Sequence, residues 1–231
     1  MVFPGLPQRI ALIRDTIRAH QEKAGWTHPV RIVAVTKSHG PEAVRAAVQA
    51  GLEDIGENRV QEALAKQEPL RDIPVRWHLI GTLQRNKVRQ VIGRFALLHA
   101  VDRAELVQEL ERRLAAANPG RRQPVLVEVN CSGEPAKSGV APGELEPLVE
   151  LVAGSPHLEL RGLMTLAPLT DRPERQRPAF AMLRMLRDRM HQAGHSLPEL
   201  SMGMSGDYPV AVEEGATMVR VGTLLFGERP Q

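Results

Sequence analysis

Hydrophobic positions along the chain follow two alternating patterns. Short runs of consecutive apolar residues, typical of strands buried on both faces, are separated by longer segments whose apolar residues recur three or four positions apart, as in amphipathic helices. The first such helix is predicted over residues 8–24, where Ile10, Ile13 and Ile17 form the apolar stripe and Gly25 follows as a stop signal.

The remainder of the chain divides into alternating strands and helices. The predicted strands cover residues 31–36, 54–56, 77–81, 96–100, 124–130, 158–164, 200–202 and 218–222. The predicted helices cover residues 41–50, 58–66, a segment from about 84, 102–117, 143–153, 174–194 and 207–214. In the helix over 174–194, Met182, Met185 and Met190 have helical spacing and are expected in the core.

Strands that alternate regularly with helices pair in parallel. The fold class expected is α/β, a single-domain (β/α)8 TIM barrel over residues 1–231 with an extra N-terminal helix, and an open doubly wound sheet is the alternative. No Pro- or Ser-rich linker or repeat divides the chain.

The amino-acid composition argues against nucleic acid as a binding partner. Of the 231 residues, 42% are hydrophobic and 25% charged, as in a soluble globular protein. Aromatic residues make up only 3%, which argues against base stacking on single-stranded nucleic acid. The net charge is +3 and the basic residues are spread along the chain, so no nucleic-acid partner is expected.

The cysteine count and the length of the apolar runs indicate the cellular compartment that is expected for this protein. Cys131 is the only cysteine, which rules out an intramolecular disulfide and a cysteine zinc cluster, and no metal site is expected. There is no apolar run of about 18 residues and no secretory signal pattern at the N-terminus. A cytoplasmic protein without a membrane span is therefore expected and, since no interface motif is evident, a monomer.

Functional residues of such a barrel lie where strands end and loops begin. Lys37 directly follows the apolar strand over residues 31–36. Desolvation at the mouth of a barrel lowers the pKa of a lysine and frees its amine to form a Schiff base with a carbonyl. A solvated lysine at a strand end is the alternative.

Two loops rich in small residues follow the last two predicted strands. The first, residues 201–207, includes Ser201, Met204, Ser205 and Gly206 and runs into a predicted helix. The second includes Gly222 and Thr223 (residues 220–227). Small residues allow backbone N–H groups to converge on an anion, and the loops after strands seven and eight are the usual phosphate site of these barrels. A phosphate-bearing ligand is therefore expected.

A closed barrel places its eighth strand beside its first, so the lysine and the phosphate loops are neighbours. Pyridoxal 5′-phosphate (PLP) carries both an aldehyde and a phosphate and would bridge them. Arg220 points to the same face as Gly222, where it could meet the pyridine nitrogen and keep it unprotonated. The alternative for Arg220 is an ion pair inside the barrel with Glu57 or Glu128.

At these positions the sequence resembles the pyridoxal phosphate homeostasis protein family. The matching segments are 33–37, 55–58, 61–62, 77–81, 84, 86–87, 129–130, 137–139, 162–165, 200–207, 218–223 and 226–227. The resemblance implies an alanine-racemase-like barrel, a Schiff base on Lys37, phosphate contacts from both small-residue loops and Arg220 near the ring nitrogen. Asn58 and His78 match family positions close to the cofactor. The loop after Lys37 (residues 38–41) departs from the family, where the proline often comes sooner.

The family implies a carrier or regulator in intracellular vitamin B6 homeostasis, without significant turnover. Its candidate partners are PLP, other B6 vitamers and acceptor enzymes that require PLP. A slow PLP-dependent racemase or transaminase and a cofactor-free Schiff-base aldolase are the alternatives. A racemase needs a second acid or base across the ring, and the only tyrosine is Tyr208, beside the phosphate loop.

Three further residues carry open hypotheses. His78 is either a general base or a hydrogen-bonded core histidine. Cys131 is expected to be a small packing residue. Lys137, in the loop 131–142, is a candidate second site for PLP in transit, against a solvated loop lysine.

Overall fold

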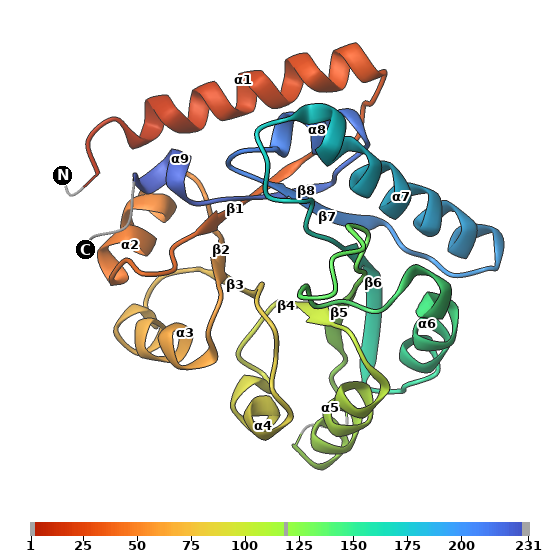
Figure 1. Cartoon of the computed structure of the whole chain (residues 1–231). Coiled ribbons are helices and arrows are strands. Elements are labelled where there is room, and N and C mark those ends of the chain that lie inside the picture. Colours follow the sequence, from red (N-terminus) through yellow and green to blue (C-terminus); the bar gives the residue numbers. More distant parts are fainter. Residues whose placement is uncertain (1–2, 118–119, 228–231) are drawn as a thin grey trace.

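Eight parallel strands form a closed barrel that is surrounded by helices (Figure 1). The computed structural model describes residues 3–117 and 120–227. Each strand pairs with the next along the chain, and β8 pairs with β1. The strands are β1 (Arg31–Val35), β2 (Asp54–Glu57), β3 (Arg76–Leu79), β4 (Leu97–Val101), β5 (Gln123–Glu128), β6 (Leu158–Met164), β7 (Glu199–Met204) and β8 (Met218–Val221). The predicted (β/α)8 barrel is confirmed, and the open sheet is wrong.

The α-helices follow the strands in the predicted order. They are α1 (Leu6–Ala24), α2 (Pro41–Gln49), α3 (Val60–Gln67), α4 (Val88–Val91), α5 (Ala104–Ala117), α6 (Leu145–Ala153), α7 (Pro173–Gln192), α8 (Tyr208–Glu213) and α9 (Thr223–Phe226). The described residues also form the 3₁₀ turns η1 (Glu68–Leu70), η2 (Arg85–Lys87) and η3 (Pro142–Glu144). The helix predicted from about residue 84 is only η2 followed by the single turn α4.

The extra N-terminal helix lies across the side of the barrel where the first and last strands meet (Figure 1). It packs against α8 and α9, and its buried residues include Ile10, Ile13 and Ile17, as their spacing predicts. This helix therefore covers the seam that closes the barrel.

Apolar side chains form two layers. The larger core lies between the barrel wall and the helices, and a smaller cluster fills the barrel interior with Val33, Leu97, Leu126, Met164 and Met218 among its members. An interior packed with side chains is usual for an eight-stranded barrel, so a ligand must bind at one end of it.

The methionines of α7 correct one expectation. Met190 is buried, but Met182 and Met185 are 40% and 66% exposed. Since α7 is amphipathic, its spacing was compatible with either face, and Phe180 and Leu183 occupy the core side.

The lengths and hydrophobicity of the described helices show whether one of them could span a membrane. In residues 3–117 and 120–227, none is both long and apolar enough to cross a bilayer. The single domain predicted for residues 1–231 includes positions 1–2, 118–119 and 228–231, which lie outside the described residues.

Candidate functional site

A pocket of about 510 Å³ opens at the carboxyl ends of the strands. Eight of the ten residues predicted for the site line it: Lys37, Asn58, Met204, Ser205, Gly206, Arg220, Gly222 and Thr223. They come from the ends of β1, β2, β7 and β8, which is the face where barrels of this kind hold their active sites. The volume is within the usual range for a small-molecule site.

The backbone before Lys37 is held by a buried ion pair. The Lys66 ammonium donates to the Thr36 carbonyl at 2.7 Å and to Glu57 Oε1 at 2.5 Å. The Thr36 hydroxyl donates to the same carboxylate oxygen. Ser38, on the other side of Lys37, has a φ of 66°, a conformation uncommon for a residue with a side chain. Lys37 therefore follows a segment that is held in place and precedes a residue with an uncommon backbone conformation.

The two small-residue loops are tied together by a hydroxyl. Ser205 Oγ lies 3.3 Å from the backbone nitrogen of Gly222 and 3.5 Å from that of Leu224, both of which donate to it. Asp207 caps the first loop, because its Oδ1 accepts the Met204 backbone N–H at 2.5 Å. The loops thus form one wall of small residues and backbone N–H groups, next to the first turn of α9.

Gly203 allows this wall to form. Its φ is 91°, and a Cβ there would lie 2.6 Å from the Ala211 Cβ and 2.9 Å from the Tyr208 Cα. The register of β7 against β8 shifts between Ser201 and Met204, which turns the loop onto α8.

We expect Gly203→Ala to lower the free energy of unfolding by about 2 kcal/mol or more, because it adds a disfavoured φ to a backbone clash. Gly206→Ala is the matched control, since its φ is not positive and no protein atom lies within 4 Å of the added Cβ. Urea unfolding measures both. Equal stabilities for the two variants would contradict the role assigned to Gly203.

Arg220 reaches the pocket from inside the barrel. Its side chain is 3% exposed, and it donates to Ser201 Oγ at 2.6 Å and to the Thr165 carbonyl at 2.9 Å. Burial lowers the pKa of Arg220 to about 10, so it remains a cation at neutral pH. Both of these acceptors are neutral.

The ion pair suggested for Arg220 with Glu57 or Glu128 is absent from the described part of the chain. Glu57 shares a strand face with Ile55, so it points away from the barrel axis and meets Lys66. Glu128 raises the pKa of Arg220 by charge attraction and makes no hydrogen bond or ion pair with it.

Glu128 is buried close to the pocket, and its Oε2 has no hydrogen-bond partner among the described residues. Burial, with the nearby Asp102 carboxylate, raises its pKa from 4.5 to about 7 against the opposing effect of Arg220. The folded state thus holds this proton more tightly than the unfolded chain does. Its contribution to stability is complete below pH 4.5 and is lost as the pH rises through about 7.

We therefore expect Glu128→Gln to remove a pH-dependent loss of stability of about 3 kcal/mol between these limits. The measurement is urea unfolding of both proteins across that pH range. Glu150→Gln, at an exposed helix position, should follow the wild-type curve. Parallel curves for Glu128→Gln and the wild type would contradict the buried proton.

The remaining two predicted site residues lie below the pocket. His78 lines a hollow of about 230 Å³ at the opposite end of the barrel and bonds to Asp54 and His99. Ser201 is fully buried and contacts Arg220 and His99. Neither side chain lines the pocket, and both are linked to it by hydrogen bonds that lead to Arg220.

Several lining residues were missed in the sequence. His39 packs edge-on against Phe3, with ring centroids 5.7 Å apart, and also contacts Phe226. Ile80 and Leu166 add apolar walls. Ile80 could have been found, because it has the same strand parity as His78, whereas His39 depends on the loop path.

The other candidates have structural partners. The Lys137 ammonium donates to the Ala167 carbonyl at 2.8 Å and lies 2.6 Å from Glu134 Oε2. Cys131 is buried, and burial raises the pKa of its thiol to about 11, so it is a weak nucleophile. The described residues contain no group of three or more His, Cys, Asp or Glu side chains arranged to hold a metal ion.

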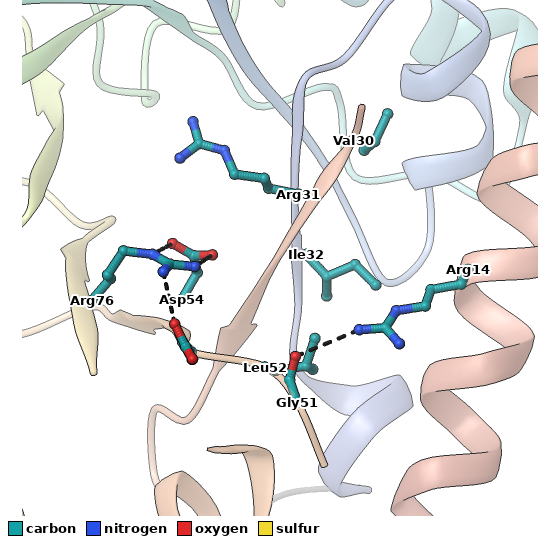
Figure 2. A pocket seen from close by; sticks show the side chains of 9 residues that line it. Arg14, Val30, Arg31, Ile32, Gly51, Leu52, Asp54 and Arg76 are labelled. Carbon is teal, nitrogen blue, oxygen red and sulfur yellow. Dashed lines mark hydrogen bonds and ion pairs between the residues drawn. The ribbon is translucent and has the colours of Figure 1, made fainter. Parts of the chain in front are cut away.

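A second hollow, of about 320 Å³, lies at the amino ends of β1 to β3. Figure 2 shows the partners of two of its arginines: Arg76 binds Asp54 and Glu53, and Arg14 reaches the Gly51 carbonyl. The third, Arg31, pairs with Glu199. Because carboxylates already match the charges of Arg76 and Arg31, this hollow is less suited to an anionic ligand than the pocket at the carboxyl end.

Comparison with known proteins identifies the relatives of this chain. Residues 10–230 match the family model "Alanine racemase, N-terminal domain". A pyridoxal phosphate homeostasis protein of Aquifex aeolicus is 44% identical over 224 residues, which cover 96% of this chain and 97% of the relative.

Two solved structures are also similar. PipY of Synechococcus elongatus PCC7942 with PLP bound superposes with a TM-score of 0.83 at 37% identity, covering 96% of this chain and 100% of that one. An alanine racemase of Clostridium difficile has a TM-score of 0.73 at 17% identity, covering 94% of this chain and 61% of that one, so the likeness is one of fold.

Proposed function

Because this chain belongs to the pyridoxal phosphate homeostasis protein family, we propose that it binds PLP as a Schiff base on Lys37 and acts in vitamin B6 homeostasis as a carrier or regulator without significant turnover. One observation supports this most: Lys37, Arg220 and the loops after β7 and β8 line the same pocket.

The lining residues fit the chemical groups of PLP. Ser205 and Thr223 offer hydroxyl donors, Gly206 and Thr223 offer backbone N–H groups, and these loops add no acidic side chain to the lining, as a phosphate requires. Ile80 and Leu166 offer apolar surface for the ring. PLP supplies a reactive aldehyde and an electron-withdrawing pyridine ring.

Lys37 supplies the nucleophile. In its neutral form the amine adds to the aldehyde carbon, and loss of one water leaves a carbon–nitrogen double bond. The reaction needs no oxidant and is reversed by water, so the ligand can be released intact to an acceptor enzyme. A covalent but reversible bond suits a carrier.

Arg220 would face the ring nitrogen. A guanidinium cannot accept a proton, so it would donate to the nitrogen and keep it unprotonated. An unprotonated pyridine is a weaker electron sink, and this lowers the reactivity of bound amino acids. This choice of partner supports a role in binding without significant turnover.

The pocket also lacks a tyrosine for acid–base work across the ring. The single tyrosine, Tyr208, is buried in the core and packs below Gly203. His39 is the remaining titratable group of the described lining besides Lys37 and Arg220, and burial lowers its pKa. A racemase or transaminase of ordinary efficiency is therefore not proposed.

The test is the addition of PLP to the purified protein. We expect visible absorption from the Schiff base, and a borohydride-stable label that peptide mapping assigns to Lys37. Pyridoxal, which lacks the phosphate, should bind at least about tenfold more weakly, the equivalent of one lost charged hydrogen bond. Absence of binding would overturn the proposal, and sustained turnover of amino acids by chiral analysis would overturn its carrier part alone.

A further inference from the structure

A line of hydrogen bonds runs through the barrel interior from the pocket floor to the opposite end. Arg220 Nη1 donates to Ser201 Oγ at 2.6 Å. Ser201 Oγ lies 2.9 Å from His99 Nδ1, and His99 Nε2 lies 2.9 Å from His78 Nδ1. His78 Nε2 lies 3.0 Å from Asp54 Oδ1. Five side chains from five strands thus form one continuous series.

The far end of this series is anchored by an ion pair. Arg76 binds both oxygens of Asp54, at 2.9 and 2.7 Å, beside the hollow of Figure 2. Burial tends to raise the pKa of Asp54, but the bonds from Arg76 and His78 outweigh it and hold the pKa well below its ordinary value. Asp54 is therefore an ionised carboxylate that can only accept hydrogen bonds.

The interior of the series is closed to solvent. Ser201 and His99 are fully buried, and His78 is 2% exposed. Burial, together with the positive charges of Arg220 and Arg31, lowers the pKa of His99 well below its ordinary value, so this ring is neutral and carries one N–H. In such surroundings each polar atom needs a partner, since an unpaired one is costly.

With His78 in its neutral form, these constraints allow one direction for the hydrogen bonds. Because Asp54 only accepts, His78 Nε2 carries a hydrogen. With His78 neutral, its Nδ1 accepts from His99 Nε2–H, His99 Nδ1 accepts from the Ser201 hydroxyl, and Ser201 Oγ accepts from Arg220. Every contact then joins one donor to one acceptor. The opposite direction needs a doubly protonated His78 and makes both His99 and Arg220 donate to Ser201.

We propose that Ser201, His99, His78 and Asp54 form a chain of positioning residues that fixes the Arg220 guanidinium at the pocket floor, with both imidazoles neutral and in the Nε2–H form. The consequence for the cofactor rests on the proposed function, whereas the order of the hydrogen bonds does not. Aligned hydrogen bonds polarise one another, so the Asp54 charge strengthens Ser201 as an acceptor. Arg220 is thereby held in place without a contact to any carboxylate of residues 3–117 and 120–227, and it can face the ligand as a cation.

The first test uses the protein without cofactor. Long-range proton–nitrogen NMR of the imidazoles at neutral pH should show His78 and His99 as neutral Nε2–H tautomers. Assignment follows from the loss of one ring signal in His99→Phe or His78→Phe. A Nδ1–H form of His99, or a doubly protonated ring at either position, would overturn the proposal. This result is independent of whether PLP binds.

The second test measures PLP binding by Ser201→Ala and by the remote Asp54→Asn. Both should weaken binding by about tenfold and shift the visible absorption maximum, since Ser201→Ala removes the acceptor of Arg220 and Asp54→Asn removes the charge that polarises the series. Leu126→Met, a volume-conserving change in the barrel interior, is the control and should keep the wild-type spectrum.

A purely structural role predicts a different outcome. It would lower the thermal unfolding midpoint of Asp54→Asn but leave the spectrum and affinity of the folded fraction within twofold of the wild type, and this would overturn the proposal. Failure of the wild type itself to bind PLP would instead overturn the proposed function, and the NMR result would still decide the chain.

Discussion

Replacement of Lys37 by alanine is expected to abolish both the visible absorption of the PLP-loaded protein and the label left by borohydride. Alanine provides no amine, so no carbon–nitrogen bond can form. The phosphate loops and Arg220 stay in place, however, because other residues hold them: Ser205 and Asp207 bond to the loops, and Ser201 accepts from Arg220. We therefore expect Lys37→Ala to retain weaker, noncovalent PLP binding that calorimetry detects.

The control for this variant is Lys137→Ala. Its ammonium is engaged with the Ala167 carbonyl and Glu134, so the label on Lys37 should be unchanged. Label remaining in Lys37→Ala would place the Schiff base on another lysine. Label on Lys37 alone in the wild type would remove Lys137 as a second site.

Replacement of Lys66 by methionine is expected to lower the free energy of unfolding by about 3–5 kcal/mol, the range for breaking a buried ion pair from one side. Lys66 and Glu57 are 8% and 0% exposed in their side chains. Burial already raises the pKa of Glu57, against the lowering effect of its bonds to Lys66 and Thr36. Without Lys66, the carboxylate must take up a proton or remain buried and unpaired.

Two comparisons make this prediction specific. The double variant Lys66→Met with Glu57→Leu removes both charges and should recover most of the loss. Lys23→Met breaks a pair with Glu213 in which the lysine is 69% exposed, and should cost less than about 1 kcal/mol. If Lys66→Met costs no more than Lys23→Met in urea unfolding, the ion pair does not hold the segment before Lys37.

The strands and most helices could be predicted because each local signal agrees with the global fold. The branched run before Lys37 and the spacing of Ile10, Ile13 and Ile17 each allow one interpretation only. The helix observed after Gln84 is shorter than predicted, because its buried apolar residues, Val88 and Val91, span less than two turns. Apolar spacing indicates a helix but does not determine its length.

The lining of the pocket was predictable where strand parity and chain order decide the position. Arg220 and Gly222 share a face, and closure of the barrel brings them beside Lys37. The partner of a charged side chain was not predictable in this way. Glu57 pairs with Lys66 on a helix, and the contact between His78 and His99 joins neighbouring strands whose register the sequence does not reveal.

The pairing of β8 with β1 has a consequence for synthesis of the chain. Val33 lies opposite Arg220 in this pairing, so the two sides of the pocket come from opposite ends of the sequence. A nascent chain emerges from its N-terminus. Lys37 therefore leaves the ribosome long before the strand that brings Arg220 and Gly222. Until that last strand docks, the lysine has neither the phosphate-binding loops nor the Arg220 guanidinium beside it. We therefore expect PLP to bind only after β8 has paired with β1 and the barrel has closed.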